Sequence, residues 1–345
     1  MSIYYTDSPI DDVADIKKIL QIQFDNLNFY LLHDPYITDS NTIDFINSDQ
    51  IDVVIYPQYI HPWNYRCVAE HFLIYGIKKP WLQLTWDSKL IGPNYMQYSY
   101  WAAKVNDVMS LECIKSAKQI PHRKYLFSCL NNVAKPHRLA VLMHLFNASY
   151  FKKTLVSMSN DYDLMHGIKI NKDLLVNSID LYHQSRYTED QYNFLYDVLP
   201  IVCPHEHKGR LVFWDHDAYT DSYLNIVTEH DFESEFISEK SIKPLLSEQL
   251  AIFVAGPGTV NLLRKIGIDV FDDIIDHSYD LETNNAKRMG LILEQLDRMV
   301  EWDWVSIYQR TKERRKTNKE FLLSGQLQDA FVQNLKNKIN ILVHS

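Results

Sequence analysis

The stretch that decides the fold is residues 223–258, YLNIVTEHDFESEFISEKSIKPLLSEQLAIFVAGPG. It opens with an apolar run that ends at Thr228 and closes with a second apolar run that ends at Gly256. Apolar runs of this length, bounded by polar residues or glycine, predict two buried β-strands. Between them a polar loop leads to Ser238-Glu239-Lys240, which opens a helix. We therefore expect carboxylates and a lysine at the carboxyl ends of two strands, where open α/β sheets bind their ligands.

The same alternation of apolar and amphipathic stretches continues through the rest of the chain, and it predicts helices around parallel sheets. The polar stretch 104–122 ends in Ile120-Pro121 and is the expected crossing between two domains. The predicted fold class is α/β, with two Rossmann-like domains facing a cleft, residues 1–115 and 116–345, and a helical C-terminal segment over 284–345. Further strands are expected at 28–33, 52–56, 81–86, 124–131, 154–158 and 211–214, and a helix at about 137–146.

Composition and charge exclude several classes of protein. Of the 345 residues, 46% are hydrophobic and 23% are charged, which is ordinary for a soluble chain, and no apolar stretch is long enough to span a bilayer. The formal net charge of -9 opposes general binding to a phosphate backbone. The N-terminal stretch MSIYYTDSPIDD is not a secretory signal, and the four cysteines are widely spaced, so a cytoplasmic location is expected.

Three short motifs follow one another along the chain, each where an apolar strand ends. The first motif is Trp86-Asp87-Ser88. The second motif is Phe127-Ser128 with Asn131, followed by Arg138 in the next helix. The third motif starts at Glu229 and continues through Phe236–Lys240 to Gly256-Pro257.

Together these motifs resemble the α1,3-fucosyltransferase family, most clearly over about residues 124–290. The family has Glu-Ser in the first motif, Ser-Asn…Arg in the second, and Tyr-(Val/Ile)-Thr-Glu-Lys before a strand ending near Gly-Pro in the third. Here Asp87 stands for the Glu and Ser238 for the Thr, so the sugar and the base of the donor stay open. The longer pattern, through Ile275–Asp280, is also similar to glycosyltransferase-like proteins of phages and bacteria.

The resemblance implies an inverting, metal-independent glycosyltransferase of the GT-B type, with an acceptor-side first domain and a donor-binding second domain. No cofactor is expected beyond the nucleotide-sugar co-substrate, GDP- or UDP-linked. Negative charge grows on the leaving phosphate, and Arg138 and Lys240 are expected to stabilise it. Glu239 is expected to accept hydrogen bonds from hydroxyls of the donor, and Asp87 to act as general base. The implied donor-binding residues are Asn131, Thr228, Arg138, Glu229, Ser238, Lys240 and Gly256.

Two metal hypotheses compete with this interpretation. An apolar strand at 211–214 leads into Asp215-His216-Asp217, a pattern typical of metal-dependent glycosyltransferases, and Asp161-Tyr162-Asp163 has the same form. Cys203, His205 and His207 alternate along the chain and, with His216, form a candidate zinc site. A binding module for sugar nucleotides that catalyses nothing is the third alternative.

The acceptor is expected to be a glycan. Tyr56, Tyr59, Trp63 and Tyr65 are candidates for sugar stacking. A hydroxymethylated base in phage DNA is the alternative acceptor, and oligomeric state stays open. The DNA would be contacted by the basic run at 310–319, which contains Arg310, Lys312, Arg314, Arg315, Lys316 and Lys319.

Overall fold

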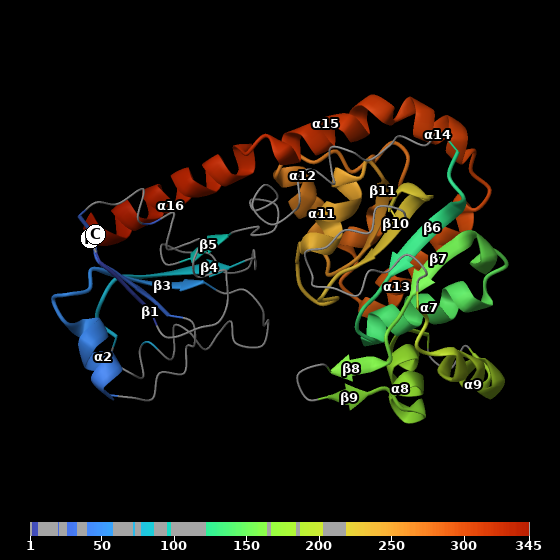
Figure 1. Cartoon of the computed structure of the whole chain (residues 1–345), viewed down its shortest axis with the longest axis horizontal. Coiled ribbons are helices and arrows are strands. Elements are labelled where there is room, and N and C mark those ends of the chain that lie inside the picture. The colour runs from blue at the N-terminus through green and yellow to red at the C-terminus, as the bar shows by residue number, and fades with distance from the viewer. Residues whose placement is uncertain are drawn as a thin grey trace. The chain divides into compact units, whose positions relative to one another are not determined.

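A computed structural model describes most of the chain, and it divides into two compact units (Figure 1). The first unit is formed by Met1–Tyr100 with Gln326–Ser345, and the second by Trp101–Gly325. Each unit contains its own parallel β-sheet. The residues that the structure describes are 2–5, 20, 26–32, 40–57, 72, 77–85, 95–97, 122–163, 167–183, 187–202 and 219–344.

The sheet of the first unit follows chain order, because each strand pairs in parallel with the next one in the sequence. Its strands are β1 (Ile3–Tyr5), β2 (Phe29–Leu31), β3 (Val53–Pro57), β4 (Trp81–Thr85) and β5 (Tyr95–Gln97), with helix α2 (Ser40–Asn47) after β2. The strands expected at 28–33, 52–56 and 81–86 are thereby confirmed. The sequence does not predict β1 or β5, because neither of these short strands lies in a longer apolar run, as β2 does.

The last helix of the chain, α16 (Gln326–His344), packs in the first unit. Its buried residues Phe331, Leu335 and Ile339 recur every four positions and join a core that includes β2 and β4. Figure 1 shows the helix lying along this sheet. The expected domain limits grouped 326–345 with the second domain, but the structure places this helix in the first unit. Periodicity shows that a helix has an apolar face, and it does not identify the surface that covers that face.

The second unit has a four-stranded parallel sheet in the order β11-β10-β6-β7. Chain order therefore reverses at the pair of β6 and β10, which is the topological switch point where open α/β sheets bind ligands. All seven residues of β10 and all five of β11 are buried, as expected for covered parallel strands. The strands are β6 (Tyr125–Leu130), β7 (Thr154–Ser157), β10 (Ser222–Thr228) and β11 (Leu250–Val254), and a small hairpin pairs β8 (Asp161–Asp163) with β9 (Ile168–Lys169).

Helices cover both sides of this second sheet (Figure 1). The helix expected at 137–146 is confirmed as α7, which starts at Pro136, a favourable residue for the first helical turn. The segment expected to be helical over 284–345 is helical but divided among α13, α14, α15 and α16. The expected strand at 211–214 lies outside the described residues. The helices are α7 (Pro136–Asn147), α8 (Lys172–His183), α9 (Glu189–Val198), α11 (Glu239–Leu246), α12 (Thr259–Lys265), α13 (Asn285–Met299), α14 (Trp304–Arg310) and α15 (Lys312–Leu323), with short 3-10 helices η2 (Phe151–Lys153) and η3 (Ser278–Leu281).

A buried cluster of two arginines and a tyrosine fixes α14 and α15 to the amino ends of β10 and β11. Arg123 Nη1 donates to the carbonyl of Ser222 at 2.7 Å, and its guanidinium lies 4.2 Å from the Tyr308 ring centroid. The Arg315 guanidinium lies 3.3 Å from the same centroid and donates to the carbonyl of Glu248. Burial lowers the pKa of Arg315 to about 10. Helices α14 and α15 are therefore held at the amino ends of the strands, opposite to their carboxyl ends.

Within the described part of the chain, none of the helices has the length and apolar character needed to cross a membrane.

Truncation of the α16 core face is predicted to destabilise the first unit. Leu335→Ala and Ile339→Ala each remove a fully buried side chain and should lower the free energy of unfolding by about 2–5 kcal/mol. The matched control is Ile341→Ala on the same helix, where the side chain is 56% exposed and a change within about 0.5 kcal/mol is expected. Denaturant unfolding followed by circular dichroism measures all three. Equal losses for the buried and the exposed positions would contradict the placement of α16.

Candidate functional site

The candidate site is the edge of the second sheet where β6, β10 and β11 end. Asn131 directly follows β6, and Thr228 is the last residue of β10. Thr228 Oγ1 donates to Asn131 Oδ1, so the two side chains meet at the switch point, and both are almost fully buried. The Asn131 backbone N–H donates to the carbonyl of Ser157 at 3.1 Å, which joins the end of β7 to the same edge. The structure thus brings together residues that lie about a hundred positions apart.

Glu229 holds the loop after β10 to the start of α11. Its carboxylate is fully buried and accepts hydrogen bonds from Ser238 N at 2.9 Å, Ser238 Oγ at 2.6 Å and His230 N at 3.1 Å. Ser241 Oγ donates to the same carboxylate. Ser238 is also the N-cap of α11, since its Oγ accepts from Lys240 N at 3.1 Å. Glu229 and Ser238 therefore shape the loop, and their almost complete burial leaves donor contact by these two residues a prediction.

Glu239 and Lys240 form an ion pair in the first turn of α11, with Nζ and Oε1 2.8 Å apart. The Lys240 side chain is 27% exposed and the Glu239 side chain only 6%. Burial opposes ionisation of Glu239, but Lys240 and Lys243 together outweigh it and hold the pKa of this carboxyl below its ordinary value. Glu239 is thus a carboxylate at neutral pH. Lys240 is a partly exposed cation at this edge.

Arg138 is buried beneath the same edge, on the first turn of α7. Its Nη2 donates to the carbonyls of Glu229 at 3.0 Å and Thr228 at 3.4 Å, and its Nη1 to the carbonyl of Val133 at 3.1 Å. Burial lowers the pKa of Arg138 to about 10 although Glu229 and Glu239 oppose the shift. Arg138 is only 3% exposed, so little of its side chain is open to a ligand. Direct contact between Arg138 and a ligand therefore stays a prediction.

Two neighbours of Arg138 at the start of α7, the N-cap residue Lys135 and His137, escape prediction from the sequence. Lys135 Nζ donates to the carbonyl of His230 at 2.7 Å, and the His137 Nε2 lies 2.8 Å from the carbonyl oxygen of Glu229. The His137 ring also stacks on Phe232, with centroids 5.5 Å apart and planes 9° apart. The signal in the sequence is the basic group 135–138 at a helix start. Positive charge at the amino end of a helix is repelled by the helix dipole, so basic residues there indicate acceptors elsewhere in the protein, here the carbonyl oxygens of the loop after β10.

Arg288 on α13 binds the other side of the loop after β10. It is fully buried, and its guanidinium lies 4.2 Å from the Phe232 ring centroid. Nη2 donates to the carbonyl of Phe232, Nε to the carbonyl of Ala255 at 3.2 Å, and Nη1 to that of Glu282 at 2.8 Å. Arg288 therefore joins the loops that follow β10 and β11. No motif singles this residue out, because a buried arginine in an amphipathic helix looks like a solvated one.

The loop after β11 leaves no room for a side chain at Gly256. A Cβ atom there would lie 2.0 Å from the backbone oxygen of Ser234. Gly258, at φ +90°, precedes α12, where Asp280 accepts hydrogen bonds from Val260 N and Asn261 N at 2.9 Å each. The amino end of α12 is therefore occupied by the protein's own carboxylate. Gly256 serves close packing of the two loops.

Several predicted residues lie outside the described residues, namely Asp87, Asp215, Asp217, Cys203, His205, His207, His216, Tyr59, Trp63 and Tyr65. Tyr56 is buried in the first unit. Asp161 is ion-paired with Lys169, and its Oδ2 accepts from Ser159 Oγ at 2.7 Å. In the part of the chain that the structure describes, no three His, Cys, Asp or Glu side chains are grouped to hold a metal ion.

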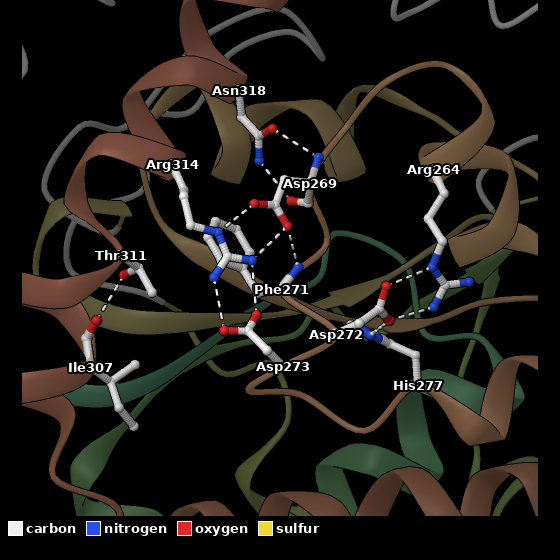
Figure 2. A network of polar contacts seen from close by, with 10 residues as sticks. All are labelled: Arg264, Asp269, Phe271, Asp272, Asp273, His277, Ile307, Thr311, Arg314 and Asn318. Carbon is white, nitrogen blue, oxygen red and sulfur yellow. Dashed lines mark hydrogen bonds and ion pairs between the residues drawn. The ribbon is translucent and has the colours of Figure 1, made fainter.

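Arg314, the centre of the basic run at 310–319, forms ion pairs with two aspartates of the protein (Figure 2). Its Nε lies 2.6 Å from Asp269 Oδ2 and its Nη2 lies 2.8 Å from Asp273 Oδ1. Its guanidinium also lies 4.7 Å from the Phe271 ring centroid. These contacts tie α15 to the loop between α12 and η3.

Two other cations of that run are also paired within the protein. Arg315 belongs to the buried cluster around Tyr308, and Lys319 Nζ lies 3.1 Å from Glu248 Oε1. At least three of the six cations in the run at 310–319 therefore make contacts within the protein. The expectation that it forms a DNA-binding surface is not supported.

Among solved structures, this chain is similar to one titled "Crystal Structure of alpha1,3-Fucosyltransferase". It shares 11% sequence identity and a TM-score of 0.37, over 90% of this chain and 89% of that chain. This TM-score is too low to establish a shared fold. No protein-family model matches the sequence. No curated protein matches it either.

Gly256→Ala is predicted to displace the loop at Ser234 and to lower the free energy of unfolding by roughly 1–3 kcal/mol, because its Cβ meets backbone. Gly290→Ala is the matched control. A Cβ at position 290, within α13, meets nothing within 4 Å, so alanine should stabilise the helix by about 0.5–1 kcal/mol. Denaturant unfolding of both variants measures the contrast. Tolerance of alanine at 256 would contradict the close packing.

Buried histidines are predicted to make folding stability fall as the pH falls. Burial holds the pKa of His137 well below 6.5, so the unfolded chain takes up this proton first. The contribution of the buried neutral His137 to the free energy of unfolding is fully present above pH 6.5. Below that pH it is lost at up to about 1.4 kcal/mol per pH unit for each such group. Burial also lowers the pKa of His277, which adds to the slope.

The variant His137→Gln removes one of these two groups. Between about pH 7 and pH 5 it should lose less stability than the wild type, measured as the difference in unfolding free energy at the two pH values. An unchanged slope would show that His137 titrates alike in the folded and unfolded chain.

Proposed function

We propose that this protein is a glycosyltransferase that moves a sugar from a nucleotide diphosphate donor to an acceptor hydroxyl. One observation carries the proposal. The Glu239–Lys240 pair opens a helix at the carboxyl end of β10, beside the switch point of a parallel sheet, and Arg138 lies buried beneath it. A nucleotide diphosphate needs a cation for its phosphates and a carboxylate for its hydroxyls, and this edge offers both.

The proposed chemistry is displacement at the anomeric carbon with inversion. As the bond to the leaving phosphate breaks, negative charge accumulates on that phosphate. The Lys240 side chain, which is partly exposed, supplies the direct contact, and the buried charge of Arg138 adds to the positive potential below it. These two cations are proposed to act without a metal ion. Glu239 stays ionised at neutral pH and accepts hydrogen bonds from hydroxyls of the sugar or the ribose.

The acceptor side of the proposal rests on the first unit. Asp87 is proposed as the general base that takes the proton of the attacking hydroxyl, which follows from its place after β4 in the sequence. A two-domain arrangement of the GT-B type, with the two sheets facing a cleft, is part of the same proposal. The acceptor proposed is a glycan, and the donor is GDP- or UDP-linked.

Binding of GDP or UDP is predicted to raise the melting temperature, because a ligand that binds only the folded protein stabilises it. Lys240→Met should weaken this binding about 10- to 100-fold, the loss expected when a charged hydrogen-bond donor is removed. The control is Lys312→Met, an exposed lysine on α15 that should change nothing. Absence of any shift with either nucleotide would rule out the proposed donor site.

Transfer assays then separate the forms of the proposal. Activity that survives a chelator supports the metal-independent form, and activity lost with the chelator favours the alternative built on Asp215 and Asp217. Asp87→Asn should abolish turnover and leave donor binding intact. Donor binding with no transfer to any glycan would instead indicate a non-catalytic binding module.

A further inference from the structure

A second polar and aromatic site lies away from the carboxyl edge of the sheet, between the end of α7 and the start of α9. It is a partly open pocket of about 180 Å³, lined by Phe146, Asn147, Asp190, Gln191 and Phe194. Asn147 is nine positions beyond Arg138 on α7, which at 1.5 Å per residue is roughly 14 Å. The two sites therefore occupy opposite ends of one helix.

The apolar wall of the pocket is an aromatic cluster with one open ring. Phe146 packs against Phe151 at a centroid distance of 4.3 Å and against Phe194 at 5.6 Å. The ring planes of Phe146 and Phe194 are 68° apart. Phe194 is nonetheless 59% exposed. Its ring is held by Phe146 and still presents apolar surface to solvent. Such a ring attracts the weakly positive C–H groups of a ligand to its negative face.

The polar wall is fixed by hydrogen bonds within the protein. Gln191 Oε1 accepts from Thr188 N at 2.8 Å in a capping box, and Gln191 Nε2 donates to Asn147 Oδ1 at 2.5 Å. Asn147 Nδ2 in turn donates to the carbonyl of Met143 at 2.8 Å. Each amide NH₂ carries a second N–H, and Asp190 adds an exposed carboxylate. The two amide donors are thus held in place before any ligand arrives, which lowers the entropic cost of binding.

We propose that this pocket binds a hexopyranose unit of a glycan. A pyranose ring has a face of C–H groups that matches the open Phe194 ring. Its neighbouring hydroxyls accept from the amide N–H groups of Asn147 and Gln191 and donate to the Asp190 carboxylate. A purely apolar ligand would leave these polar groups unpaired, which costs binding energy. The site goes beyond the proposed transfer reaction, because glycan binding here requires neither a donor nor turnover.

The test is direct binding of lactose, maltotriose and chitotriose, measured by saturation-transfer NMR and by calorimetry. At least one of these sugars should bind the wild type with a Kd on the order of 1 mM or below, and Phe194→Ala should weaken that binding at least about tenfold. Asp190→Asn should also weaken it. Leu181→Ala, a 62% exposed residue on α8 that does not line the pocket, is the matched control and should bind as the wild type does.

Three results would overturn the proposal: no binding of any of the three sugars, binding that survives Phe194→Ala, or displacement of the bound sugar by GDP or UDP. Circular dichroism checks that the variants fold, as expected for an exposed position. Lys240→Met separates this site from the donor site, since it should keep sugar binding and lose nucleotide binding. If neither nucleotide binds the wild type but a sugar does, the donor proposal fails and this one stands.

Discussion

The candidate site depends on basic side chains, the arginines among them buried and charged, that hydrogen-bond to the backbone carbonyls of one loop. Arg138, His137 and Lys135 approach the loop after β10 from α7, and Arg288 approaches it from α13. Each hydrogen bond from a charged group contributes about 1.5–3 kcal/mol, and removal of the cation leaves buried carbonyls unpaired. Together these contacts fix where Ser238 begins α11. The position of the Glu239–Lys240 pair follows from that start.

The opposite edge of the same sheet is held in the same way. Arg123 and Arg315 donate to the carbonyls of Ser222 and Glu248 at the amino ends of β10 and β11. Both guanidinium groups also contact the Tyr308 ring, and the Tyr308 hydroxyl donates to the carbonyl of Glu248. Strands β10 and β11 are therefore held at both ends by arginines whose pKa values are lowered by burial. A sheet fixed at both edges gives its loops a rigid base, which a site needs for preorganised electrostatics.

The sequence predicts the strands and the loop residues of the second unit well, because β10 and β11 are continuous apolar runs that end in polar or glycine residues. It does not predict the burial of Arg138, since a cation on a helix looks solvated until the carbonyls it binds are known. For the same reason the sequence does not predict the burial of Arg288. The unit that α16 joins also escapes prediction, because its apolar face fits any uncovered sheet. Asp280 is missed as a helix cap because twenty residues separate it from Val260.

The central claim is that the carboxyl edge of the second sheet binds a nucleoside diphosphate. Hydrogen–deuterium exchange with and without saturating GDP or UDP tests it most directly, because it locates the bound ligand on the chain. The account predicts slower exchange in 229–240 and 255–258, with the amino ends of β10 and β11 unchanged. Binding without protection of these two segments, or protection confined to other segments, would contradict it.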